Sequence, residues 1–274
     1  MKTSKLTAFL TAAACIGCFA GCGKKSEKNS SENKTANDTS PAADVEATVP
    51  AVGGDELTAD NYNEEKYLDK INEKIKNAKV SDKSVELGSV GETVTPAEGS
   101  EEYELGEYRI SDNGIKLYYD DKEFSDELML SLAEYFTAVS AADYETYSSF
   151  ILPSYIEKME TFLKENYDYD HKTSFAKRCS SFATQMNGDY RITRIKLETA
   201  EPHEEGKDNI DEFLSSLDEV FGDNYSEAIK SESDELIDAA FYVMAADSTG
   251  KETMLISDYE IVFAVKDGKY YTFG

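Results

Sequence analysis

Six Lys and Arg side chains gather between residues 172 and 196, a stretch that contains a single acid, Asp189. The whole chain, in contrast, has 28 Lys and Arg against 55 Asp and Glu. Guanidinium and ammonium groups bind carboxylate, phosphate and sulfate oxygens, so this local excess of cations predicts an anion-binding site. The residues that we expect to form the site are Lys177, Arg178, Arg191, Arg194 and Lys196. The alternative is that these side chains pair with the surplus acids elsewhere in the fold.

The chain has two histidines, and neither lies in a catalytic or metal-binding motif. His171 follows Asp168 and Asp170, but the spacing fits no zinc motif and the segment lacks the Gly of a calcium loop. We therefore interpret this segment as a solvated loop between helices. His203 lies in a polar loop beside Glu204, with no nucleophile close to it in the sequence. Nothing in the sequence requires a metal ion or another cofactor.

Other reactive groups are equally isolated. Tyr118, Tyr119, Tyr242 and Tyr259 are candidates for a catalytic hydroxyl, although we expect them to serve mainly as core aromatics. Cys179 lies inside an apolar helical pattern, which predicts a buried thiol rather than a nucleophile. Neighbouring acids carry little information in a chain with 55 carboxylates. Because no nucleophile elbow, phosphate-binding loop or dinucleotide fingerprint is present, the sequence identifies no catalytic residues.

Residues 1–21 are typical of a secretory signal peptide. A short basic start precedes an apolar run that is shorter than the ~20 residues needed to cross a bilayer. The run ends in Phe19-Ala20-Gly21-Cys22, which resembles the lipobox of bacterial lipoproteins, where a diacylglycerol is attached to the Cys before cleavage. The resemblance implies lipidation of Cys22, with Cys15 and Cys18 as competing sites, and a cell-membrane protein that faces outside the cytoplasm. The alternatives are an ordinary secretory signal or an uncleaved anchor.

Residues 22–100 are expected to form a flexible tether between the lipidated Cys and the folded domain. Residues 23–61 contain no aromatic side chain, and such a composition cannot bury enough surface to offset chain entropy. Apolar spacing predicts a weak helix near 60–78, after which three Gly and one Pro return the chain to linker character. Since 27 of the 31 aromatics follow residue 100, we place the folded domain at 101–274.

The pattern of residues 101–274 predicts an α+β fold, with helices packed in a curved antiparallel sheet and preceded by a β-hairpin. We expect the hairpin over Tyr103–Ile110 and Ile115–Asp120, joined at Asn113-Gly114. Helical spacing of apolar residues predicts helices that begin near Ser125, Asp143, Pro153, Thr173 and Asp208. The expected strands are Tyr190–Glu198, Glu235–Ala246, Glu252–Lys266 and Lys269–Phe273. Irregular alternation in the first of these strands predicts a bulge near Thr193-Arg194.

Two local stretches and the order of the elements indicate a known fold. The first stretch is Ala142-Asp143-Tyr144-Glu145 followed by Ile151-Leu152-Pro153, and the second runs from Ile261 to Tyr271. They resemble the loop between the first helices and the closing hairpin of the nuclear transport factor 2-like family. The resemblance covers about residues 125–273 and implies a cone-like sheet with an internal pocket. Because many unrelated activities occur on this fold, it implies no particular reaction.

These observations favour a lipid-anchored extracytoplasmic protein whose α+β domain binds a ligand or a protein partner without catalysis. One alternative is a small-molecule enzyme on the cone-like fold, which requires an inward-facing carboxylate or His beside a Tyr, with a perturbed pKa. Another is a structural envelope lipoprotein, which should show no pocket and a large apolar surface patch. The net charge of −27 disfavours nucleic acid and anionic lipid as partners, so we expect membrane contact through the lipid anchor.

Overall fold

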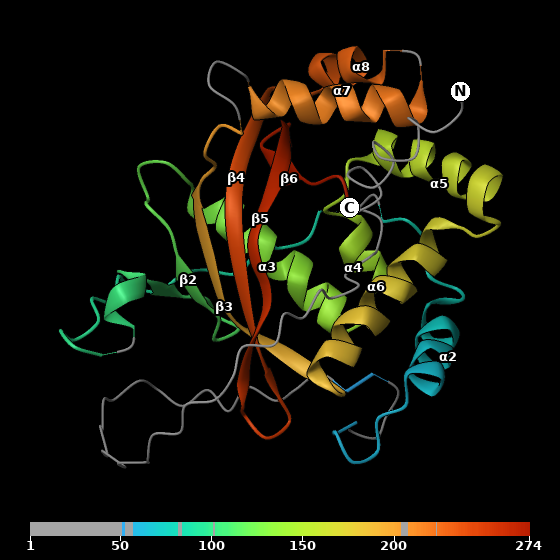
Figure 1. Cartoon of the computed structure of the whole chain (residues 1–274). Helices are drawn as coiled ribbons and strands as arrows, with labels where there is room; N and C mark the ends of the chain where they lie inside the picture. Colours follow the sequence, from blue (N-terminus) through green and yellow to red (C-terminus); the bar gives the residue numbers. More distant parts are fainter. Residues whose placement is uncertain (1–50, 53–56, 82–83, 101, 204–207, 223) are drawn as a thin grey trace.

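The computed structural model of the chain describes residues 51–52, 57–81, 84–100, 102–203, 208–222 and 224–274 (Figure 1). The predicted signal peptide, Cys22 and most of the predicted tether therefore lie outside the described residues. The described part has the α+β class that the sequence predicts. Among its helices, none combines the length and the apolar composition that a bilayer crossing requires.

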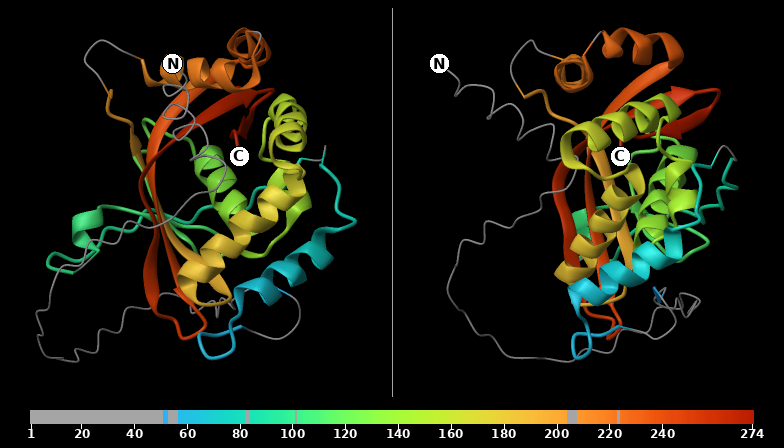
Figure 2. Two further views of the ribbon diagram at one scale, coloured as in Figure 1. Left: turned by 45° about the vertical axis from the view of Figure 1, so that its right-hand side comes forward. Right: turned by 90° about the vertical axis from the view of Figure 1, so that its right-hand side faces the viewer.

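In the described residues, six strands form one sheet in the order β1-β2-β3-β4-β5-β6. The strands are β1 (Arg109–Ile110), β2 (Lys116–Tyr118), β3 (Tyr190–Thr199), β4 (Glu235–Asp247), β5 (Glu252–Lys266) and β6 (Lys269–Tyr271). Neighbours run antiparallel except β2 and β3, which are parallel. Figures 1 and 2 show that the long strands curl around the helices, so the sheet has the expected curvature.

The first two strands are shorter than their sequence pattern indicates. β1 and β2 pair antiparallel over two residues each. Tyr103–Leu105, expected as part of a strand, forms a 3₁₀-helix. Upstream of β1, Val90 forms an isolated bridge to Ser111, and Val94 forms one to Tyr108. Part of the predicted linker thus pairs with the chain around β1.

The helices begin where the sequence provides caps. They are α2 (Glu64–Ile75), α3 (Asp126–Ser140), α4 (Tyr144–Ser148), α5 (Pro153–Tyr167), α6 (His171–Met186), α7 (Asn209–Phe221) and α8 (Tyr225–Glu232). Ser125 accepts a hydrogen bond from the amide of Leu128 and caps α3, as predicted. Pro153 is the first residue of α5, also as predicted. The short α8 has no counterpart among the expected elements, because only Tyr225 and Ile229 mark its buried face.

The core lies between the helices and the concave face of the sheet (Figure 2). The pairing of β3 with β4 shifts between Ile192 and Arg194, which confirms the predicted bulge. As a result, Tyr190 and Ile192 lie on the same buried side as Ile195 and Leu197, whereas strict alternation would place the two pairs on opposite sides. The bulge therefore supplies the sheet with one continuous apolar face.

The folded part extends upstream of residue 101, the predicted boundary. α2 packs against α6 and buries Tyr67, Ile71 and Ile75. Asp189, which precedes β3, accepts hydrogen bonds from the amides of Val52 and Leu57. Tertiary packing, rather than intrinsic helix propensity, stabilises α2. The spacing of its apolar residues alone therefore predicts a weaker helix than the structure contains.

Replacing Ile71 tests whether α2 belongs to the cooperative fold. Ile71→Ala removes a fully buried side chain and should lower the free energy of unfolding by about 2–5 kcal/mol. Asn72→Ala, at the exposed neighbouring position, is the matched control and should change it by less than about 0.5 kcal/mol. The measurement is urea unfolding followed by circular dichroism. Equal stability of the two variants would show that α2 docks without contributing to the core.

Candidate functional site

A cavity of about 120 Å³ lies between α6 and the last long strand, β5. Its wall is largely apolar and contains seven aromatic rings, those of Tyr135, Phe136, Phe182, Phe213, Phe241, Tyr259 and Phe273. Several rings contact one another, with centroids 5.6 Å apart for Phe136 and Phe241 and 5.7 Å apart for Phe241 and Tyr259. These contacts join α3 to the concave side of β4 and β5. The cavity is therefore part of the space that the curved sheet encloses.

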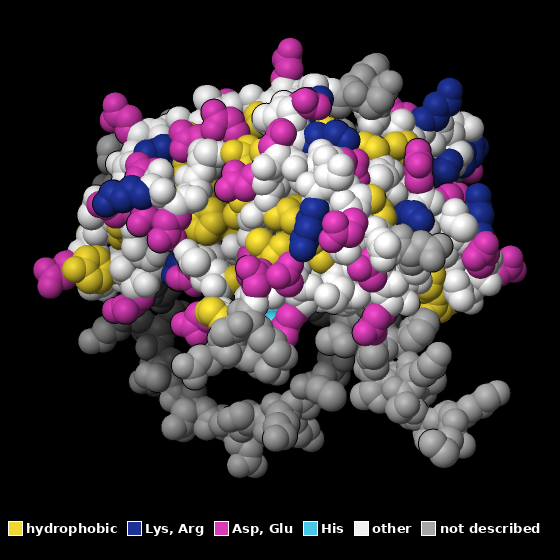
Figure 3. All heavy atoms as spheres, turned by 90° about the horizontal axis from the view of Figure 1, so that it is seen from above, with side chains coloured by type: hydrophobic (Ala, Val, Ile, Leu, Met, Phe, Trp, Pro, Cys, Tyr) yellow, Lys and Arg dark blue, Asp and Glu magenta, His cyan; other side chains and the backbone are white. Residues whose placement is uncertain are grey.

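A second cavity of about 550 Å³ adjoins the first and lies among α5, α7 and β5. The two cavities share five residues, namely Phe213, Tyr259, Glu260, Val262 and Phe273. We call the combined space the β5 cleft and use this name for the residues that line either cavity. Seen from the α7–α8 end, hydrophobic side chains reach the surface among acidic and basic ones (Figure 3). The cleft thus joins an aromatic interior to a polar mouth.

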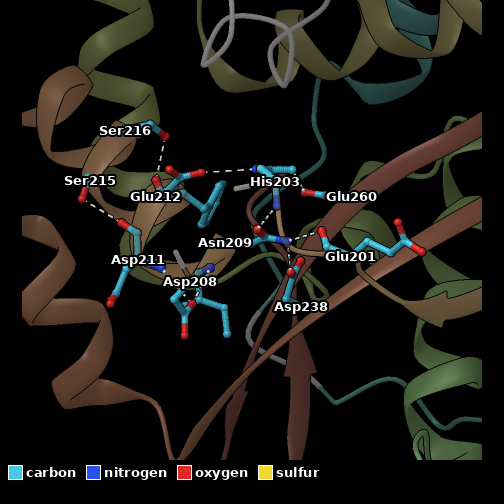
Figure 4. A network of polar contacts seen from close by, with 12 residues as sticks. Glu201, His203, Asp208, Asn209, Asp211, Glu212, Ser215, Ser216, Asp238 and Glu260 are labelled. Carbon is cyan, nitrogen blue, oxygen red and sulfur yellow. Dashed lines mark hydrogen bonds and ion pairs between the residues drawn. The ribbon is translucent and has the colours of Figure 1, made fainter. Parts of the chain in front are cut away.

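The mouth is held by His203, which bridges α7 and β5 (Figure 4). Its Nε2 lies 2.6 Å from Glu260 Oε2, and its Nδ1 lies 3.3 Å from Glu212 Oε2. The hydrogen bond to Glu212, together with the charge of Glu260, raises the pKa of His203 above its usual value. Burial raises the pKa of Glu260, an effect that the neighbouring His203 partly offsets. A carboxylate and an imidazole in contact can share a proton, as general acid–base catalysis requires.

Asn209, the first residue of α7, fixes the backbone around this bridge. Its side-chain amide donates to the carbonyl of Glu201 at 3.0 Å and to Asp238 Oδ2 at 2.9 Å. Its side-chain oxygen accepts from the amide of His203 at 3.0 Å. Asp238 Oδ1 is buried and has no hydrogen-bond partner among the described residues. The mouth therefore contains a carboxylate oxygen whose hydrogen-bonding capacity is unused within the described fold.

The predicted anion site does not form as one cluster. Arg191, Arg194 and Lys196 alternate with the buried residues of β3 and so lie on the outer side of the sheet. Lys177 and Arg178 belong to α6, on the concave side, and both line the β5 cleft. The five residues are close in the sequence but do not gather in space. β3 follows α6 after a short turn, and its cations point to the side of the sheet that faces away from α6.

Four of the five cations make contacts within the described fold, two of them with acids and two with tyrosines. Arg194 contacts Glu252 through Nη2 at 2.6 Å and through Nε at 3.2 Å. Lys196 contacts Glu198 at 2.6 Å. The ammonium of Lys177 lies 3.7 Å from the centroid of the Tyr169 ring, and Arg178 donates to the hydroxyls of Tyr135 and Tyr147. Within the cleft, Arg178 thus acts first as a partner of the aromatic wall.

The interpretation of His171 as part of a solvated loop is wrong. His171 opens α6, is 4% exposed, and its Nδ1 lies 2.9 Å from the hydroxyl of Tyr144. Burial and the nearby charge of Arg178 lower the pKa of His171 to about 4. The preceding acid, Asp170, caps the helix by accepting from the amide of Thr173. The helix therefore begins earlier than predicted and carries the imidazole into the core.

Of the four candidate tyrosines, Tyr259 alone lines the β5 cleft in the described structure. Tyr119 donates to Asp126 at 2.6 Å, away from the cleft, and Tyr242 lies near Asp258 at 3.4 Å. Tyr118 is buried. Cys179 is also buried, as predicted, and burial raises the pKa of its thiol. In the part of the chain that the structure describes, no group of His, Cys, Asp and Glu is suited to a metal ion.

Glu260, Asn209 and Asp238 are site residues that sequence reasoning missed. For Glu260 the sequence contains a signal, because this charged residue lies inside the apolar run Tyr259-Glu260-Ile261-Val262. The chain matches no known protein family, and no curated protein or solved structure matches it. The function must therefore be argued from the β5 cleft itself.

The two histidines should titrate in opposite directions from the ordinary value of about 6.5. Imidazole NMR signals of the full chain should show His203 titrating above 6.5 and His171 near 4. By linkage, His203 stabilises the fold below about pH 6.5, and this contribution disappears as pH rises through its folded pKa. His171 stabilises the fold above about pH 6.5, and its contribution disappears as pH falls toward 4. A pKa near 6.5 for both imidazoles would contradict the contacts of His203 and the burial of His171.

Proposed function

We propose that this chain is an exported, lipid-anchored protein that faces outside the cytoplasm and binds a ligand or protein partner, without catalysis, in the β5 cleft. The aromatic cleft is the observation that carries this proposal. Concave sites with apolar walls and a few convergent polar groups are the usual places for ligands. Here the apolar wall includes Phe182, Phe213 and Phe241, and the polar groups include Asn209 and Glu260.

The position of the cleft also supports the proposed likeness to the nuclear transport factor 2-like fold. In that family the pocket lies inside the cone, between the helices and the sheet. The cleft here is lined by residues of the helices α3, α6 and α7 and of the strands β4 and β5. A cleft of this kind favours a binding role over a purely structural envelope role, for which we expected no pocket.

A second candidate function is acid–base catalysis on a small molecule. It is favoured by Glu260, a carboxylate with a raised pKa that lines the cleft beside Tyr259 and contacts His203. This is the arrangement that the enzyme alternative requires. The two functions differ in the fate of a bound small molecule, which a binding protein releases unchanged. Glu260→Gln would abolish turnover in an enzyme while preserving the shape of the cleft.

Filling the cleft tests the proposed binding site. The probe is 8-anilinonaphthalene-1-sulfonate, an aromatic anion whose fluorescence rises in apolar surroundings. Ser181 lines the aromatic cavity, so Ser181→Phe should weaken saturable probe binding at least about tenfold by occupying the space. Ser215→Phe, the same substitution at an exposed position of α7, should leave the affinity near the wild-type value. Identical probe affinity in the wild type and both variants would place the binding elsewhere.

Replacing the proposed lipidated residue tests the anchor. In bacterial cells fed a radioactive fatty acid, the wild-type chain should carry label and Cys22→Ser should carry none, because the thiol is the point of attachment. Cys179→Ser is the control and should keep its label, since that thiol is buried in the domain. Persistent labelling of Cys22→Ser would point to Cys15 or Cys18, and absence of label from the wild-type chain would refute the anchor.

A further inference from the structure

Most of β5 is paired on one side only. β4 pairs with β5 from Glu252 to Val265, whereas β6 pairs only with Ala264–Lys266. After β6 the chain leaves the sheet, since Thr272 bridges to Ile151 beside the start of α5. Among the strands of the described structure, none covers the other edge of β5 between Ile256 and Phe263. An uncovered strand edge presents backbone donors and acceptors that can pair with another chain.

The direction of the backbone groups can be assigned along this edge. The carbonyl of Val265 accepts a hydrogen bond from the amide of Asp234 at 2.7 Å and therefore points toward β4. Backbone groups of successive residues in a strand alternate in direction. The amide and carbonyl groups of Glu260 and Val262 consequently point away from β4, toward the uncovered edge.

The β5 cleft follows the uncovered edge. Four consecutive residues, Tyr259, Glu260, Ile261 and Val262, line the aromatic cavity. A cavity over one face of a sheet is lined by every second residue of a strand, because successive side chains point to opposite faces. A lining by consecutive residues places the cleft at the side of the strand. At the other end of the edge, Gln185 of α6 donates to the carbonyls of Met254 and Leu255 and closes it.

The charges at the mouth are complementary to a basic partner. The larger cavity is lined by the carboxylates of Glu212, Asp238, Asp258 and Glu260, with His203 as their only cationic neighbour in the described lining. His203 contacts Glu212 and Glu260, while Asp238 Oδ1 has no hydrogen-bond partner in the described fold. The net charge of −27 adds long-range attraction for a cationic chain.

We propose that the uncovered edge of β5 binds an extended segment of a partner protein, which adds to the sheet as a further strand. The segment carries a bulky apolar side chain that enters the aromatic cavity and a Lys or Arg that faces Asp238 and Asp258. This proposal rests on the β5 cleft being the binding site and names the class of occupant. Backbone hydrogen bonds give such a complex affinity, and pockets for alternate side chains give it specificity.

Peptides with blocked backbone amides test strand addition without altering the protein. The probes are fluorescent heptapeptides in which Phe or Val alternates with Lys, measured by polarisation against the full chain in detergent. N-methylation of every second amide produces two complementary peptides, and only one set of amides can face β5. One methylated peptide should bind at least about tenfold more weakly than the parent, and the other should bind within about threefold of it. Equal behaviour of the two peptides would overturn the proposal.

The charge of the segment is tested from both sides. Heptapeptides with Glu in place of Lys should bind at least about tenfold more weakly. Asp258→Asn should weaken the Lys peptide about two- to fivefold. Asp267→Asn, an exposed aspartate that also has a positive φ but lies in the β5–β6 turn, should bind like the wild type. Equal affinity for the Lys and the Glu peptides would refute the proposal that the partner segment is basic.

The outcomes separate this proposal from the proposed function. If 8-anilinonaphthalene-1-sulfonate binds and Ser181→Phe blocks it, but no alternating peptide binds, the cleft takes a small molecule and strand addition is wrong. If neither the dye nor any peptide binds, both proposals fail. A concentration-dependent dimer in sedimentation that peptides do not dissociate would assign the edge to a second copy of the chain, and would also overturn the proposal.

Discussion

β3 keeps its large apolar side chains on one side because it gains an extra residue between Ile192 and Arg194. Without this bulge, a period-two strand would divide Tyr190 and Ile192 from Ile195 and Leu197, and half of them would face water. Similar irregularities interrupt the pairing of β4 with β5 near Phe241 and Val243. Bulges bend strands, so the same feature that collects the apolar residues also favours the curl that encloses the helices.

The curl determines where charge and aromatic surface are found. The outer side of β3 carries its cations, and the contact of Arg194 with both oxygens of Glu252 ties β3 to β5 across β4. The inner side carries aromatic rings, and Arg178 enters only with its guanidinium bonded to tyrosine hydroxyls. In this acidic chain, four of the five predicted cations contact a carboxylate or an aromatic ring within the described fold. A local excess of cations is therefore weak evidence for an anion site.

The β5 cleft lies in the space that β6 and α7 leave beside β5. β6 ends after Tyr271, and Thr272 turns the chain toward α5 instead of continuing along β5. α7 then approaches from the other side, where His203 and Asn209 connect it to the strands. The result is an aromatic cavity that opens along a strand edge. Side-chain pockets and backbone hydrogen-bonding groups thus occur together, which distinguishes this cleft from one that is walled by side chains alone.

The sequence by itself determined the α+β class, the cap of α3 at Ser125, the start of α5 at Pro153 and the bulge in β3, because caps, proline and side-chain periodicity act within a few residues. Only the tertiary structure decided that α2 belongs to the core, that His171 is buried, and that Glu260 meets His203. Those outcomes depend on which face each element presents to a distant partner. That choice depends on packing across the whole fold, and local periodicity carries no information about it.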